Sequence, residues 1–277
     1  MSNNIRRGGN MSHYAVLVIH KEDQDIEELL APYSEHLEVE PYFKYTVDEA
    51  IDYIKEHYVP YNDYLKEYTD RQLIDWFAEN KGLLIKQGGL YSTYNPNSKW
   101  DWYSIGGRFD GDLDLTDEGI EEAINYPNNP QWFKNMSREE QIEHVKWVNT
   151  APLKYIKWFT PLSEEDKAEL KRWWEINIDG DELKDGEEKD EYFFWNLEWF
   201  KRRYKDADTY LRVKEMVTFF AVLTPDGEWH EPGRMGYFAC ALCEPEDELK
   251  WDLEFYDNFI KPNLDSDLIC TVVDCHI

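Results

Sequence analysis

Two continuous apolar runs, one near each end of the chain, constrain the fold most strongly. Residues 13–19 and 268–274 are rich in β-branched side chains and do not alternate with polar ones. Such runs are typical of strands that are buried on both faces in the interior of a sheet. We therefore predict an α+β protein in which the N- and C-terminal parts form one mixed or antiparallel sheet.

Helix signals occupy the chain between these two ends. Capping-box patterns at Thr46 and Thr69 predict helices that run to about residues 58 and 80. Ser137 and Ser163 are expected N-caps farther along, in a stretch whose tryptophans are spaced as buried helical stripes. The part from about 115 to 213 is therefore predicted to be helical.

The expected domain organisation follows from these signals. Residues 11–114 and 214–277 form the sheet domain, and residues 115–213 form a helical insertion with acidic flanks. Residues 1–10 are polar and contain glycine, so they are predicted to be a flexible extension. The segments 217–223 and 236–240 are further expected strands, and 246–260 an expected helix.

Composition limits the kinds of partner. Aromatic residues make up 16% of the chain, which excludes a wholly disordered protein, and the formal net charge is −28. This charge repels phosphates and anionic lipids, so direct nucleic-acid binding and membrane binding are not expected. The chain shows no membrane-spanning run and no secretory leader, which favours a cytoplasmic location. The acids could also serve only to keep an aromatic-rich protein soluble.

Motifs for common cofactors are missing from the sequence. It contains neither a Walker loop nor a G-x-G-x-x-G loop, and neither a G-x-S-x-G elbow nor an H-E-x-x-H helix. No cofactor is expected. A metal site is not expected either, except for one zinc hypothesis that joins Cys240, Cys243, Cys275 and His276.

The segment 95–108 concentrates hydrogen-bonding groups among large aromatic rings. Aromatic faces can stack on a base or a sugar, and the basic side chains supply positive charge in an acidic protein. A turn at 95–97 and the pair Gly106-Gly107 predict a strand, a turn and a second strand. The alternative is a hairpin whose rings pack into the core. The expected ligand-binding residues are Lys99, Trp100, Asp101, Trp102, Tyr103 and Arg108.

Three residues at the chain ends are candidates for acid–base catalysis. Asp274 and His276 are two apart, so they share one face if the strand runs through them. A carboxylate beside an imidazole sets its tautomer for proton transfer, and His13 could join them if the two terminal strands are neighbours. The alternative is an exposed terminal histidine without a catalytic role.

Three stretches together resemble a group of uncharacterised phage and prophage proteins. They are MSHYAVLVI at 11–19, YNPNSKWDWYSIGGR at 94–108 and TVVDCHI at 271–277. The resemblance covers the two ends and leaves the helical middle unmatched. It implies a viral or mobile-element setting, in which small accessory proteins often blunt host defences.

Two functions from different classes are consistent with these features. In the first, a phage-type accessory protein binds and inhibits a host protein with a basic surface through its own acidic surface. In the second, the chain binds or hydrolyses a nucleotide or a small polar ligand at 95–108, with Asp274 and His276. Convergence of the two polar clusters in space would favour the second. The residues leave open whether the protein is an enzyme.

Overall fold

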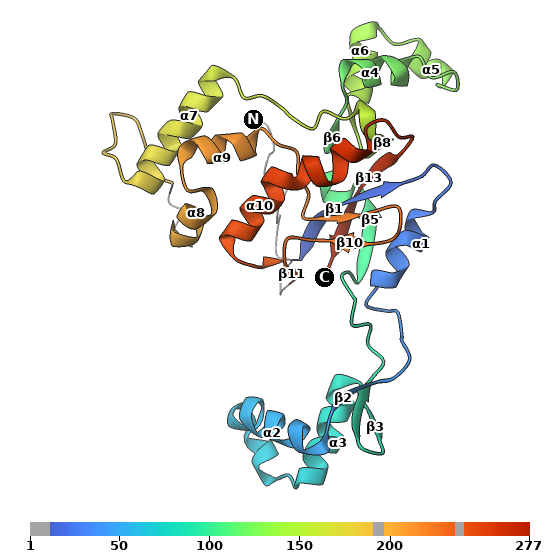
Figure 1. Ribbon diagram of the computed structural model, residues 1–277, viewed down its shortest axis with the longest axis vertical. Helices are drawn as coiled ribbons and strands as arrows, with labels where there is room; N and C mark the ends of the chain where they lie inside the picture. The colour runs from blue at the N-terminus through green and yellow to red at the C-terminus, as the bar shows by residue number, and fades with distance from the viewer. Residues whose placement is uncertain (1–11, 191–196, 236–240) are drawn as a thin grey trace. The chain divides into compact units, whose positions relative to one another are not determined.

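The computed structural model describes residues 12–190, 197–235 and 241–277, and it shows an α+β protein (Figure 1). The chain divides into two compact units. The larger unit joins Met1–Leu30 to Trp100–Ile277, and the smaller unit is Ala31–Lys99. No helix in the described part of the chain is long and apolar enough to cross a membrane.

The larger unit is built on a mixed sheet that both ends of the chain enter, as predicted. Its main path runs β10 (Trp229–His230), β9 (Ala221–Leu223), β1 (His13–His20), β13 (Ile269–His276) and β5 (Trp102–Ile105). Strand β1 is parallel to β9 and antiparallel to β13. The short strand β8 (Thr150–Pro152) also pairs with β13, in line with β5, because β1 occupies the other edge.

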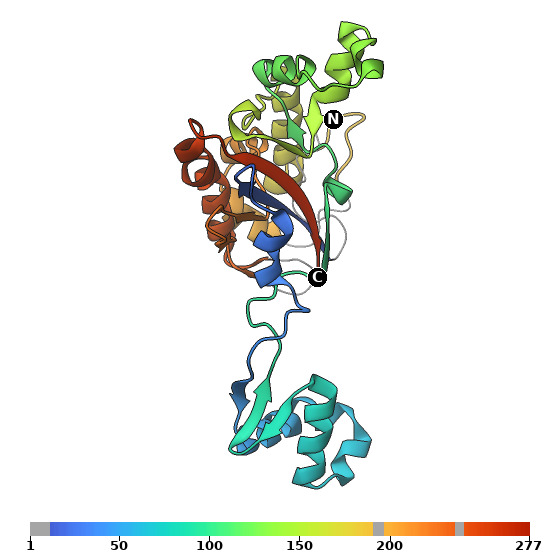
Figure 2. The ribbon, with the colours of Figure 1, turned by 90° about the vertical axis from the view of Figure 1, so that its right-hand side faces the viewer.

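Burial explains why these two terminal runs become neighbours. All eight residues of β1 are buried, and Ala15, Leu17 and Ile19 contribute to a core that includes Val272 of β13. Helix α10 (Pro245–Phe255) lies along the sheet (Figures 1 and 2). The indole Nε1 of Trp251 on this helix donates to the carbonyl oxygen of Phe219 at 2.9 Å.

The part expected as a helical insertion is mainly helical, but it also completes the sheet domain. Its helices are α4 (Asp117–Ile124), α5 (Gln131–Lys134), α6 (Arg138–Val145), α7 (Glu164–Trp174), α8 (Leu197–Tyr204) and α9 (Ala207–Lys214). This part also supplies β8, and its residues Leu115, Phe133 and Trp158 belong to the same core as β1. The two compact units divide at 30/31 and 99/100.

A buried ion-pair network fixes α8 to α10. The guanidinium of Arg203 lies 2.6 Å from the carboxylate of Glu248 and 2.7 Å from that of Asp252. Asp252 also accepts a hydrogen bond of 3.0 Å from the hydroxyl of Thr218. The network lies beside an apolar cluster that includes Trp174 and Tyr210 of α7 and α9. Removal of Arg203 would take the shared positive charge from two buried carboxylates, so we expect substitution of Arg203 to be costly.

The smaller unit packs two helices against a three-stranded antiparallel sheet. The strands are β2 (Tyr42–Tyr45), β3 (Leu84–Lys86) and β4 (Gly89–Ser92), in the order β2-β4-β3, and the helices are α2 (Val47–His57) and α3 (Asp70–Lys81). The predicted capping boxes at Thr46 and Thr69 are both formed. Helix α3 ends at Gly82, whose φ of +60° favours glycine.

Shorter elements connect these parts. They are α1 (Ile26–Leu30), the strands β6 (Leu113–Asp114), β7 (Trp147–Val148), β11 (Arg234–Met235) and β12 (Ala241–Leu242), the 3₁₀ turns Ala31–Tyr33, Val59–Tyr61, Asp63–Glu67, Gly107–Phe109, Leu153–Tyr155 and Lys261–Asn263, and the π-helical turns Glu175–Asp179 and Tyr256–Ile260. The turn Tyr256–Ile260 directly follows α10, and together they cover the helix predicted at 246–260.

Two strand predictions need correction. The strands expected on either side of residues 95–97 exist as β4 and β5, but they do not form a hairpin because they pair in different sheets. The strand expected at 217–223 covers only Ala221–Leu223. The backbone N–H of Val217 donates instead to the carbonyl oxygen of Trp158, outside the sheet. The predicted extension 1–10 and strand 236–240 lie outside the described residues.

Candidate functional site

Strand register brings the candidate catalytic residues to one end of the large sheet. His276 of β13 is directly opposite His13 of β1 on one side and Trp102 of β5 on the other. Asp274 comes two residues earlier on β13, and therefore lies on the same face. This is also the face that carries Ala15 and Leu17 into the core. The polar cluster therefore continues an apolar face of the sheet.

The first histidine–carboxylate pair is buried. The Nδ1 atom of His13 lies 2.8 Å from Oδ1 of Asp274, and the two residues are only 6% and 1% exposed. The other carboxylate oxygen, Oδ2, accepts the backbone N–H of Arg108 at 2.9 Å. Since a carboxylate accepts hydrogen bonds, this contact assigns the imidazole proton to Nδ1 and leaves Nε2 as the basic nitrogen.

The contact with Asp274 leaves the second ring nitrogen of His13, Nε2, unused. It has no hydrogen-bond partner in the described part of the chain, where Arg203 Nε is the only buried side-chain nitrogen or oxygen without one. The ring as a whole is almost entirely buried.

The second pair is more open. The Nδ1 atom of His276 lies 2.7 Å from Oδ1 of Asp101, and both side chains are 27% exposed. Oδ1 of Asp101 also accepts the backbone N–H of Trp102 at 2.7 Å. The backbone N–H of Asp101 donates to the carbonyl oxygen of His276 at 3.0 Å. The second imidazole is thus held through Nδ1, as the first is. The main-chain contact fixes Asp101 beside it.

The rings of both histidines contact each other and Trp102. The centroids of the two imidazoles are 4.9 Å apart, and their planes meet at 72°. Trp102 stacks on His276 at 5.3 Å and meets His13 edge-on at 5.1 Å. The tryptophan is nevertheless 45% exposed. It therefore orders the second imidazole and still presents indole surface to a ligand.

Two glycines after β5 allow the chain to approach Asp274. Gly106 and Gly107 have φ values of +70° and +55°, which glycine tolerates best. A Cβ atom on Gly107 would lie 2.5 Å from Oδ2 of Asp274 and from the hydroxyl of Ser104. The glycine pair therefore provides both the positive φ and the close approach that aim the next N–H, that of Arg108, at the carboxylate.

The other predicted ligand-binding residues are dispersed. Tyr103 is opposite Cys275 in register, so it lies on the other face of the sheet, and burial raises the pKa of its phenol. Trp100 packs edge-on against Tyr103 at 5.1 Å and donates from Nε1 to the carbonyl oxygen of Leu30 at 3.2 Å. Both residues therefore have structural contacts away from the histidines.

The two basic residues of the predicted site differ in position. Arg108 is exposed, and its backbone is anchored on Asp274. Lys99 belongs to the smaller unit, where its backbone N–H donates to the carbonyl oxygen of Tyr33 at 2.7 Å. Among the basic residues expected at the site, Arg108 is thus the one whose backbone the larger unit holds at Asp274.

The zinc hypothesis gains no support from the described cysteines. Cys243, Cys275 and His276 do not group, and no cluster of three or more metal-ligating side chains occurs in the part of the chain that the structure describes. Cys275 is fully buried on the face opposite His276, and burial raises the pKa of its thiol. Cys240 lies outside the described residues.

The structure pairs the predicted acid–base residues differently from the expected Asp274–His276 couple. Asp274 binds His13, and His276 binds Asp101, so the site contains two histidine–carboxylate pairs instead of one. The sequence placed Asp101 in the ligand-binding segment and gave no signal for its pairing. Its partner is 175 residues away in the chain.

No known protein family, curated protein or solved structure matches the chain.

Proposed function

We propose that this protein is an acid–base hydrolase of a small polar substrate. One observation carries the proposal: two imidazoles with centroids 4.9 Å apart are each held through Nδ1 by their own carboxylate. Two imidazoles this close can supply a general base and a general acid to one reaction. Asp101 and Trp102 of the segment 95–108 meet His276 here, and this partial convergence favours the ligand-acting hypothesis.

The environments of the two histidines suggest different roles. His13 is the general base, because the buried carboxylate of Asp274 stabilises the imidazolium that forms when Nε2 accepts a proton. His276 is more exposed and is the general acid, which exchanges its proton with solvent between turnovers. In the reaction, water loses a proton to His13, and the water oxygen forms a bond to the phosphorus atom of the substrate. The bond to the leaving group then breaks, and the leaving oxygen takes the proton from His276.

The side chains around the pair favour a phosphoester of a nucleotide as the substrate. The exposed indole of Trp102 offers a stacking surface for a base, and Arg108 supplies positive charge for a phosphate. The net charge of −28 disfavours a polymeric nucleic acid but repels a mononucleotide less. The proposed substrate is therefore small and carries one planar ring.

The test is a hydrolysis assay with matched histidine variants. Candidate substrates are 2′,3′-cyclic mononucleotides and p-nitrophenyl esters of phosphate and acetate, each assayed with and without a chelator. His13→Gln and His276→Gln should each lower kcat by about 10²- to 10⁴-fold, the usual contribution of one proton-transfer residue. His36→Gln, an exposed histidine of the smaller unit, is the matched control.

The pH profile separates catalysis from structural damage. A general base and a general acid together give a bell-shaped dependence of kcat/KM on pH, and removal of either histidine should abolish one limb. Turnover that is equal in His13→Gln, His276→Gln and the wild type would refute the proposal. So would the failure of every nucleotide to bind in calorimetry.

A further inference from the structure

A cavity lies apart from the histidine site, among α4, α5, α6 and the chain that leads into β8. Its volume is about 640 Å³, within the range of small-molecule pockets. None of the residues of the two histidine–carboxylate pairs lines it. The lining residues used below are Glu122, Tyr126, Trp132, Phe133, His144 and Tyr155.

The walls of this cavity are held by specific contacts. Helix α4 approaches Tyr155 at Gly119, where an added Cβ atom would lie 2.7 Å from the Cβ atom of Tyr155. The backbone N–H of Thr116, the N-cap of α4, donates to the carbonyl oxygen of Tyr155 at 2.8 Å. On the other side, His144 packs against the buried ring of Phe133 with centroids 5.6 Å apart. The cavity is thus fixed by packing on both sides.

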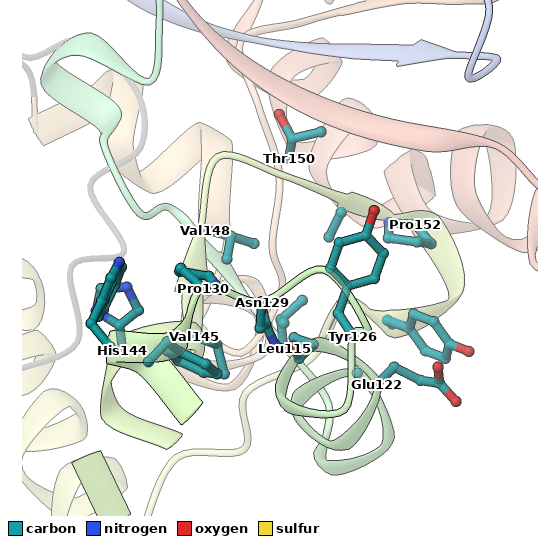
Figure 3. Close-up of a pocket in the computed structure, with 16 residues that line it drawn as sticks. Leu115, Glu122, Tyr126, Asn129, Pro130, His144, Val145, Val148, Thr150 and Pro152 are labelled. Atoms are coloured by element: carbon teal, nitrogen blue, oxygen red, sulfur yellow. Dashed lines mark hydrogen bonds between the residues drawn. The ribbon is translucent and has the colours of Figure 1, made fainter. Parts of the chain in front are cut away.

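The lining exposes aromatic surface to solvent. Tyr126 and Trp132 are 55% and 56% exposed, and Trp132 meets the ring of His144 edge-on at 5.4 Å. Figure 3 shows Tyr126 and Glu122 on one side of the pocket and His144 on the other. Large rings left open around a cavity are a feature of ligand sites, because a ligand would bury them.

Among the Asp, Glu, Lys and Arg residues, Glu122 alone lines the cavity. Glu122 is exposed and has no ion pair in the described part of the chain, and no lysine or arginine lines the cavity. Of the nearby cations, Arg138 is paired with Glu121, and Lys134 donates to the carbonyl oxygen of Pro127. Lys154 lies over the ring of Tyr155 at 5.0 Å from its centroid. Tyr155, a ring of the lining, therefore already has an ammonium group as a neighbour.

We propose that this cavity binds an apolar organic ammonium ion. The ammonium group faces the carboxylate of Glu122 and the ring of Tyr126, and the apolar body of the ligand extends among the other rings toward Trp132 on the opposite side. Cation–π attraction and the unpaired carboxylate both favour a cation over a neutral or anionic molecule of the same shape. The net charge of −28 also attracts a cation over longer distances.

The experiment compares three probes that differ in charge: 3-phenylpropylamine, 3-phenylpropan-1-ol and 3-phenylpropionate. Affinities are measured by calorimetry at neutral pH. The site is identified by fluorine NMR on protein labelled with 5-fluorotryptophan, with the Trp132 resonance assigned from Trp132→Phe. The amine should bind about fivefold more tightly than the alcohol, which corresponds to one exposed cation–π or ion-pair contact. It should also shift the Trp132 resonance.

Two variants with the same charge change test the role of Glu122. Glu122→Gln should bring the amine within about twofold of the alcohol, whereas Glu118→Gln should preserve the difference. Glu118 lies on the same helix but does not line the cavity. Equal affinity for all three probes, a preference for the carboxylate, or binding that leaves the Trp132 resonance unmoved would each overturn the proposal.

Discussion

Replacement of Gly107 by alanine tests how the protein holds the Asp274 carboxylate. A Cβ atom at this position would lie 2.5 Å from Oδ2 of Asp274, whereas ordinary contacts begin at 3.4 Å. The carboxylate must therefore withdraw by roughly 1 Å. Such a shift cannot preserve both the 2.8 Å contact with His13 and the 2.9 Å contact with the backbone of Arg108.

The expected loss of stability has two parts. Alanine at a φ of +55° costs about 1–2 kcal/mol through its backbone conformation. A buried carboxylate that loses one of its hydrogen bonds costs about 1–3 kcal/mol more. The total for Gly107→Ala is therefore about 2–5 kcal/mol. Gly227→Ala should cost only the backbone part, because Gly227 has a φ of +84° and nothing within 4 Å of an added Cβ atom.

The assay must report on the larger unit alone, since a chain of two units need not unfold in one step. Hydrogen exchange of the amide protons of β1 measures the opening free energy of the sheet. Nitrogen NMR of the imidazoles reports whether His13 keeps its proton on Nδ1. Equal stability losses in Gly107→Ala and Gly227→Ala, with unchanged imidazole spectra, would refute the proposed close approach.

Three further predictions concern the core, the thiols and the surface charge. Asp252→Ala should destabilise the larger unit by about 1–3 kcal/mol because the buried Arg203 keeps Glu248 but loses its hydrogen bond to Asp252, whereas the exposed Asp257→Ala should cost under about 0.5 kcal/mol in urea unfolding. Burial raises the pKa of the Cys270 and Cys275 thiols, so both should resist alkylation at pH 8 in the native protein, as mass spectrometry would show. Their contribution to stability is complete below the unfolded thiol pKa of about 8.5 and declines above it, so unfolding free energies should fall between pH 8 and pH 10. Inhibition of a host protein by an acidic surface also stays a prediction, and a several-fold rise in salt should then sharply slow association in stopped-flow measurements.

The sequence by itself determined those helices and strands whose signals are contained in a few consecutive residues. Thr46 and Thr69 predicted their helices because a capping box needs only one turn of chain. The apolar run 13–19 predicted an interior strand because a strand buried on both faces needs no polar alternation. The shared face of Asp274 and His276 followed from the two-residue period of a strand. Each of these depends on backbone geometry and on burial alone.

The tertiary structure decided which of these residues meet. His13 binds Asp274 across 261 residues, and His276 binds Asp101 across 175 residues, because β13 pairs with β1 on one edge and β5 on the other. A shift of one residue in either register would move every side chain of that strand to the opposite face. Register is set by the burial of the whole sheet, which no local pattern contains. The two histidine–carboxylate pairs therefore exist only in the folded chain.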